Sequence, residues 1–167
     1  MNTNKYSIPV QLGIETYTEE SDHKITILMD SIEIASKTFK KDTIDSIDFN
    51  ENYDFVKPGF YNLIINWNGD KECREKYFKI KVCKMNNKII NTITIDIEPF
   101  ENEYIKELKS NNINEYYDKL IRPGKKHGWY GVYKIDFCIG TEKDIRLLLR
   151  DSKSYIAKRT FSNKIYV

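Results

Sequence analysis

The stretch VKPGFYNLIINWNGD, residues 56–70, carries the strongest fold signal in this chain. It begins with a Pro-Gly turn signal and continues with large side chains at every second position: Tyr61, Leu63, Ile65 and Trp67. This period of two predicts a β-strand with those side chains on one face. The dipeptide Asn68-Gly69 is typical of a tight hairpin, so we expect the chain to turn back directly into a second strand at residues 77–83.

The same alternation extends over most of the first 98 residues. In the strand at 77–83 it places Phe78, Ile80 and Val82 on one face and Cys83 on the other, so Leu63, Ile65, Ile80 and Val82 should share one core. Further alternating segments occupy residues 10–14, 25–29, 32–34 and 89–97, with turns at Asp30-Ser31 and Asn86-Asn87. The chain has 24 isoleucines and two alanines, which also favours strands over helices. Short strands at this spacing predict a mostly β fold of the β-sandwich type.

Residues 43–82 resemble immunoglobulin-like or related β-sandwich modules. In those modules a Pro-Gly-aromatic turn opens an alternating strand that ends near a tryptophan, as Pro58, Gly59, Phe60 and Trp67 do here. The resemblance implies an architecture only. Because such sandwiches host many unrelated functions, it says little about what this chain does.

A length of 167 residues predicts a single domain, 1–167. Possible sub-units are a β-sandwich at 1–98, a helical connector at 99–121 and a C-terminal β unit at 122–167. An apolar stripe at helical spacing predicts the helical insert at residues 101–121. Residues 129–139 alternate again, and their inner-facing set should be Trp129, Tyr133, Ile135, Phe137 and Ile139, with Tyr130 pointing away.

Residues 141–151 have two interpretations. Thr141 and Asp144 resemble a helix capping box, and the following IRLLLR is compatible with a helix. We expect strands instead, because residues 145–149 and 151–161 resemble residues 25–29 and 30–39, as if one strand-turn-strand unit occurred twice.

The segment RPGKKHGWYG, residues 122–131, is the first candidate binding site. Its glycines expose backbone N–H groups that can cradle an anion, and its aromatic rings can stack on a base or sugar. It matches neither the Walker phosphate loop nor a dinucleotide-binding fingerprint, and the alternative is a solvated connector. The candidate residues are Arg122, Lys125, Lys126, His127, Trp129 and Tyr130.

Two further charged patterns are candidate surfaces. An acidic row recurs at every third residue, without the spacing of a calcium loop, and we expect either a solvated strand edge or a surface for a basic partner. Its members are Asp42, Asp45, Asp48, Glu51 and Asp54. In residues 77–84, Lys79 and Lys81 lie beside an aromatic residue, as on RNA-binding sheets, although lysines that protect a strand edge give the same pattern.

Composition argues against several function classes. The net charge is +2, and no apolar run is long enough for a membrane span or a signal sequence, so we expect a cytoplasmic protein that binds no membrane. Cys73, Cys83 and Cys138 have no metal or disulfide spacing, so free thiols are expected. His23 and His127 are the only histidines, so we expect neither an enzyme nor a metal or other cofactor. A Cys138–His127 nucleophile is disfavoured because Cys138 lies on an alternating strand, and no two of the many carboxylates stand out as a catalytic pair.

The sequence therefore predicts a non-enzymatic domain that binds another protein. An immunity or inhibitor protein, which neutralises a toxin or an enzyme, is the most concrete form of this prediction. One alternative is a carbohydrate-binding sandwich module that uses Trp67, Trp129 or Tyr130 for stacking. Another is a protein that binds a nucleotide, nucleic acid or small anion through residues 122–131.

Overall fold

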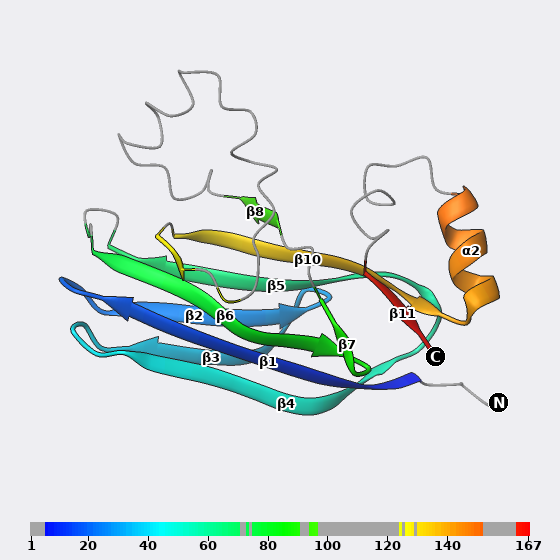
Figure 1. Cartoon of the computed structure of the whole chain (residues 1–167), viewed down its shortest axis with the longest axis horizontal. Helices are drawn as coiled ribbons and strands as arrows, with labels where there is room; N and C mark the ends of the chain where they lie inside the picture. Colours follow the sequence, from blue (N-terminus) through cyan, green and yellow to red (C-terminus); the bar gives the residue numbers. More distant parts are fainter. Residues whose placement is uncertain are drawn as a thin grey trace, which may run out of the picture.

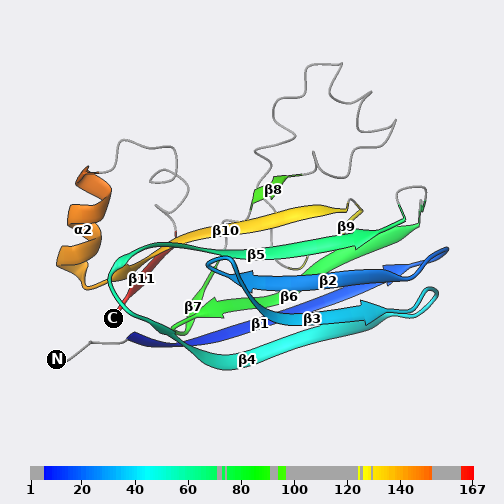
Figure 2. The ribbon, with the colours of Figure 1, turned by 180° about the vertical axis from the view of Figure 1, so that it is seen from behind.

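The computed structural model describes residues 6–70, 73, 75–90, 94–96, 124, 126–128, 130–151 and 163–167. Within these residues the chain is mostly β, with strands in two sheets and one short helix, α2 (Glu142–Asp151). Figure 1 shows β1, β4 and β6 in the near layer, and Figure 2, seen from behind, shows β2, β3 and β5 in front of them.

Sheet A has the strand order β4-β1-β6-β7, and the short β9 also pairs with β6. Its strands are β1 (Tyr6–Thr18), β4 (Asp45–Phe55), β6 (Lys76–Met85), β7 (Lys88–Ile89) and β9 (Lys126–His127). Sheet B has the order β11-β10-β5-β2-β3, with β8 paired to β10. Its strands are β2 (His23–Met29), β3 (Ile32–Phe39), β5 (Gly59–Gly69), β8 (Thr94–Asp96), β10 (Gly131–Gly140) and β11 (Lys164–Tyr166).

The inner faces of the two sheets share one apolar core. Leu63, Ile65 and Trp67 of β5 are fully buried, which confirms the predicted alternation of this strand. The ring of Phe78 in sheet A stacks on that of Tyr133 in sheet B, with centroids 4.2 Å apart. Each large apolar side chain buried in this way contributes about 1.5–3 kcal/mol to the stability of the fold.

The predicted hairpin at Asn68-Gly69 is wrong. β5 pairs with β2 and β10 in sheet B, and the chain then crosses to sheet A, where β6 pairs with β1. A type I′ hairpin needs positive φ at both turn residues, and neither Asn68 nor Gly69 has it. Gly69 instead makes room for a ring, because a Cβ there would lie 2.3 Å from the Tyr130 hydroxyl oxygen. Turns do form at Asp30-Ser31 and Asn86-Asn87, as predicted, and both residues of each turn have positive φ.

A β-bulge corrects the predicted faces of β6. Gly13 of β1 pairs with Val82, whereas the next residue, Ile14, pairs with Ile80, so Lys81 is an extra residue in β6. A bulge of this kind reverses the alternation beyond it. Ile80 is therefore buried as predicted, but Cys83 and not Val82 faces the core.

Residues 142–151 form helix α2, so the expected strand at 145–149 is wrong. The capping box is present: the Thr141 hydroxyl accepts a hydrogen bond from the Asp144 N–H at 3.2 Å, and Asp144 Oδ2 accepts one from the Thr141 N–H. The side chains turned toward the protein are Ile145, Leu148 and Leu149, which have helical rather than strand spacing. The apolar run is compatible with a helix or a strand, and the capping box at its start favours the helix.

The C-terminal part of the chain contributes to both sheets, since β9 pairs with β6 and β10 with β5. The expected helical insert at 101–121 lies outside the described residues, as do Trp129 and residues 152–162 of the proposed repeat. Of the strand expected at 89–97, β7 ends at Ile89 and β8 occupies 94–96. No helix in the described part of the chain is long and apolar enough to span a membrane.

Candidate functional site

The outer face of sheet A brings together residues from the separate sequence candidates. Glu15 and Tyr17 of β1 and Tyr77 and Lys79 of β6 alternate with buried residues and so point away from the core. Lys126 of β9 lies on the same side, because its Nζ is over the Tyr77 ring. We call these five residues the tyrosine face. Lys79 belongs to the predicted basic sheet surface and Lys126 to the predicted binding loop, so strand pairing joins two candidates that lie 47 residues apart.

The register of the strands sets the geometry of the tyrosine face. Tyr17 lies directly opposite Tyr77, and their rings stack with centroids 6.0 Å apart and planes 28° apart. Lys79 lies opposite Glu15 on one side and Lys126 on the other. Stacked aromatic pairs of this kind contribute about 0.5–1.5 kcal/mol beyond the area that they bury.

Polar contacts hold the Tyr77 ring in place. Its hydroxyl donates a hydrogen bond to Glu15 Oε2 at 3.0 Å, and Lys126 Nζ lies 4.3 Å from the ring centroid. Burial, together with this carboxylate, raises the pKa of Tyr77 to about 12. Desolvation, followed by the charge of Asp42, also raises the pKa of Tyr17. Both phenols are therefore neutral hydrogen-bond donors at neutral pH.

Gly13 and an ion pair continue this surface toward β4. Lys81 Nζ lies 3.4 Å from Asp48 Oδ1. A Cβ on Gly13 would lie 2.9 Å from that carboxylate oxygen and 3.1 Å from Val82 Cγ1, so the glycine lets both neighbours settle on the sheet. Because both charged side chains are solvent-exposed, the pair contributes at most about 1 kcal/mol.

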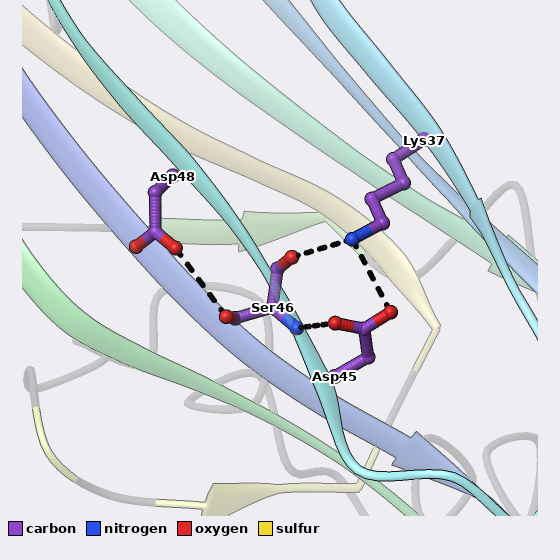
Figure 3. A network of polar contacts seen from close by, with 4 residues as sticks. All are labelled: Lys37, Asp45, Ser46 and Asp48. Carbon is purple, nitrogen blue, oxygen red and sulfur yellow. Dashed lines mark hydrogen bonds and ion pairs between the residues drawn. The ribbon is translucent and has the colours of Figure 1, made fainter.

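Other members of the acidic row connect the edges of the two sheets (Figure 3). Lys37 of β3 makes an ion pair with Asp45 at 3.2 Å and donates a hydrogen bond to the Ser46 carbonyl at 2.9 Å. Ser46 in turn donates its N–H to Asp45 and its hydroxyl to Asp48. The N–H of Ser46, and then Lys37, lower the pKa of Asp45.

The acidic row does not form one surface. A spacing of three on a strand alternates between faces, so Asp48 and Asp54 point outward from β4 while Asp45 and Glu51 are in the opposite phase. Asp42 precedes the strand in a turn with φ 57°. β4 is an edge strand of sheet A, which matches the solvated-edge interpretation. Within the described residues, no three His, Cys, Asp or Glu side chains come together as a metal site requires.

Three members of the predicted basic loop, Arg122, Lys125 and Trp129, lie outside the described residues. His127 pairs with Phe78 through the backbone of β9. Tyr130 is 3% exposed, so the expectation that it points away from the core is wrong. β10 begins only at Gly131, so alternation does not extend back to Tyr130, whose ring packs edge-on against Trp67 at 4.6 Å.

The structure also places the residues considered for catalysis and stacking. Cys73, Cys83 and Cys138 are free and buried, and burial raises the pKa of Cys83 to about 12 and that of Cys138 to about 11. Cys138 lies near the end of β10, where its neighbour is Lys164, so it is not placed to pair with His127 of β9. Trp67 is fully buried, which leaves it and Tyr130 unable to stack on a sugar.

Glu15 and Tyr17 were not among the residues singled out by the sequence. The alternation of Val10, Leu12 and Ile14 continues to the end of β1, and it already predicts that Glu15 and Tyr17 point outward. The alternation does not predict which strand lies beside β1. Tyr77, which contacts Glu15, is 62 residues away in the sequence.

Comparisons of the chain with protein-family models, with curated proteins and with solved structures found no match.

Proposed function

We propose that this chain is a non-enzymatic domain that binds another protein through the tyrosine face. The observation that supports the proposal is the Tyr17–Tyr77 pair, which stacks on the outer side of a sheet with Glu15 and Lys126 held against it. Tyrosines are enriched at binding hot spots because they supply a large contact area at a low cost in side-chain entropy. Fixed charges around such a pair add specificity.

The mixed charge of this surface favours a protein over a nucleic acid. Lys79, Lys81 and Lys126 lie beside the carboxylates of Glu15 and Asp48. A phosphate backbone selects a uniformly basic surface, and carboxylates beside the lysines would repel it. A protein partner can match both signs.

The more specific parts of the proposal are an inhibitor or immunity role in the cytoplasm and an immunoglobulin-like sandwich. Such an inhibitor needs a rigid complementary surface and no reacting group, which fits paired strands and thiols whose pKa is raised by burial. Pro58, Gly59 and the buried Trp67 carry the immunoglobulin-like pattern.

The test begins by capturing partners from the source cell with the wild-type chain and identifying them by mass spectrometry. The affinity of each purified partner is then measured for Tyr77→Ala and Tyr17→Ala. We expect each change to weaken binding by about 30-fold, as hot-spot truncations do. Tyr166→Ala is the matched control, because Tyr166 is an exposed tyrosine on β11.

A second pair of variants examines charge. Lys126→Glu should weaken binding and reduce its dependence on salt, whereas Lys24→Glu, an exposed lysine of β2 in sheet B, should leave both unchanged. Affinities that stay at the wild-type value in Tyr17→Ala and Tyr77→Ala, with the fold intact, would overturn the proposal.

A further inference from the structure

A cavity of about 430 Å³ opens at the end of the sandwich where β4 connects to β5. The β2–β3 turn lies at the same end, as Figures 1 and 2 both show. The cavity is lined by Asp30, Tyr53, Asp54, Phe55, Val56, Lys57 and Tyr61. Its volume lies within the range of small-ligand sites, and none of its residues belongs to the tyrosine face.

The walls of the cavity are aromatic rings set at angles to one another. Phe55 is almost fully buried, with Tyr53 at 4.9 Å and 56° on one side and Tyr61 at 4.7 Å and 63° on the other. Phe137 of β10 packs behind Phe55 and Tyr61, at 5.8 Å and 6.1 Å. The rings therefore form a concave wall and not a flat platform.

Hydrogen bonds hold the two sides of the opening. The Tyr61 hydroxyl donates to the Lys57 carbonyl at 2.6 Å, which ties the β4–β5 loop to the aromatic wall. The Asp30 N–H donates to the Asn62 carbonyl at 2.9 Å, which ties the β2–β3 turn to β5. The cavity is thus built from anchored segments before any ligand arrives.

The charge at the opening is net negative. Asp30 and Asp54 are both exposed carboxylates, against the single cation of Lys57. In the described part of the chain neither carboxylate makes an ion pair. Burial raises the pKa of Tyr61, and the negative charge of Asp30 raises it further, so this carboxylate is close enough to influence the aromatic wall.

We propose that this cavity binds an organic cation, through an alkylammonium or guanidinium group held against the Tyr53 and Tyr61 rings and beside Asp30, while Asp54 adds negative charge at the rim from the outer face of β4. The negative faces of aromatic rings attract such cations, and angled rings offer more than one face to the same group. A sugar ring would need a flat platform, and a calcium ion would need six to eight oxygen ligands. Neither condition is met by rings at 56° and 63° with two carboxylates.

The experiment follows side-chain NMR signals of Tyr53 and Tyr61 while the protein is titrated with choline. The probe 3,3-dimethylbutan-1-ol, which replaces the quaternary nitrogen by carbon, is the matched neutral control. We expect choline to bind about tenfold more tightly than this alcohol, since only the charged probe gains a cation–π contact with the tyrosine rings. Acetyl-arginine-amide and an arginine-containing peptide then distinguish a free small cation from a side chain presented by a protein.

Two carboxylate variants sharpen the test. Asp30→Asn should weaken choline binding several-fold and Asp54→Asn should weaken it less, because Asp54 points outward from β4; asparagine tolerates the positive φ of Asp30. Glu33→Gln is the control, because Glu33 is an exposed carboxylate on β3 outside the cavity. Tyr53→Leu, checked for an unchanged melting temperature, should abolish the preference for the cation while it retains an apolar wall.

Three results would overturn the proposal. Equal affinity for choline and its neutral isostere would identify an apolar site, and shifts with glucose but not with any cation would identify a saccharide site. The absence of shifts at Tyr53 and Tyr61 with every cation would show that the cavity binds no cation. None of these outcomes affects the protein-binding proposal, which is tested with other residues.

Discussion

The two ends of β5 carry aromatic residues on the same inner face but differ in how they are covered. At the end near Gly69, which we call the closed end, Trp67 is fully buried, and its Nε1 donates a hydrogen bond to His23 Nδ1 at 2.9 Å. The Tyr130 ring then packs onto Trp67. At the end near Gly59, the open end, Tyr61 remains half-exposed and lines a cavity.

This difference shows that alternation decides the face of a side chain but not what covers it. The cover of the closed end comes from residues that are distant in sequence: His23 is 44 positions from Trp67, and Tyr130 is 63 positions from it. The open end has a short loop and a tight turn at its rim, and both leave the rings accessible. We therefore expect the closed end to stabilise the fold and the open end to bind a ligand.

The largest effect should come from truncating the closed end. Trp67→Ala removes a fully buried ring together with its hydrogen bond to His23, and should lower the free energy of unfolding by about 3–5 kcal/mol. Tyr53→Ala at the open end removes a half-exposed ring and should cost about 1 kcal/mol. Urea denaturation of both variants at neutral pH measures the difference. Equal losses would show that the two ends do not differ in their contribution to stability.

Acidification should weaken the closed end. Burial lowers the pKa of His23 to about 4, from an ordinary value of 6.5. His23 therefore binds a proton more readily in the unfolded chain than in the folded chain between these pH values. Its contribution to the free energy of unfolding is fully present above pH 6.5 and is lost as the pH falls toward 4. The expected loss is up to about 3 kcal/mol, since each pKa unit corresponds to 1.36 kcal/mol.

Urea denaturation at several pH values measures this loss. In His23→Gln, the free energy of unfolding should fall less steeply with decreasing pH, because the contribution of His23 is gone. Effects of the carboxylates are common to both proteins and cancel in the comparison. His127→Gln should retain the slope. Identical slopes for the wild type and His23→Gln would contradict the assignment.

The smallest effect on stability should come from substituting the glycines at the two ends of β5. Gly69→Ala places a Cβ 2.3–2.9 Å from the Tyr130 side chain, whose ring is buried and cannot move freely, so we expect a loss of about 1–3 kcal/mol. Gly59→Ala meets its nearest atom at 3.8 Å, without a positive φ, and should be neutral or slightly stabilising. Thermal unfolding of the two variants tests the pair. A stable Gly69→Ala protein would mean that Tyr130 does not fill this space.

Part of the candidate site was accessible from sequence. Lys79 and Lys126 were singled out, and the alternation in β1 and β6 placed Tyr17 and Tyr77 on outer faces. The cavity was not foreseen, because Asp30 comes from one turn and Tyr53 and Tyr61 come from two different sheets. The Lys81 bulge was not foreseen either, since its position depends on Gly13 of the neighbouring strand.

The sequence by itself determined the local features of this protein. Period-two alternation specified the buried face of β5, and left-handed turns formed at Asp30-Ser31 and Asn86-Asn87, because these properties depend on neighbouring residues alone. Only the tertiary structure decided that β5 pairs with β2 and β10 and not with β6, that Tyr130 is buried over Gly69, and that Tyr17 stacks on Tyr77. The physical reason is that closing a longer loop adds only a small entropic cost, so the burial of apolar surface, rather than proximity in sequence, selects which strands pair.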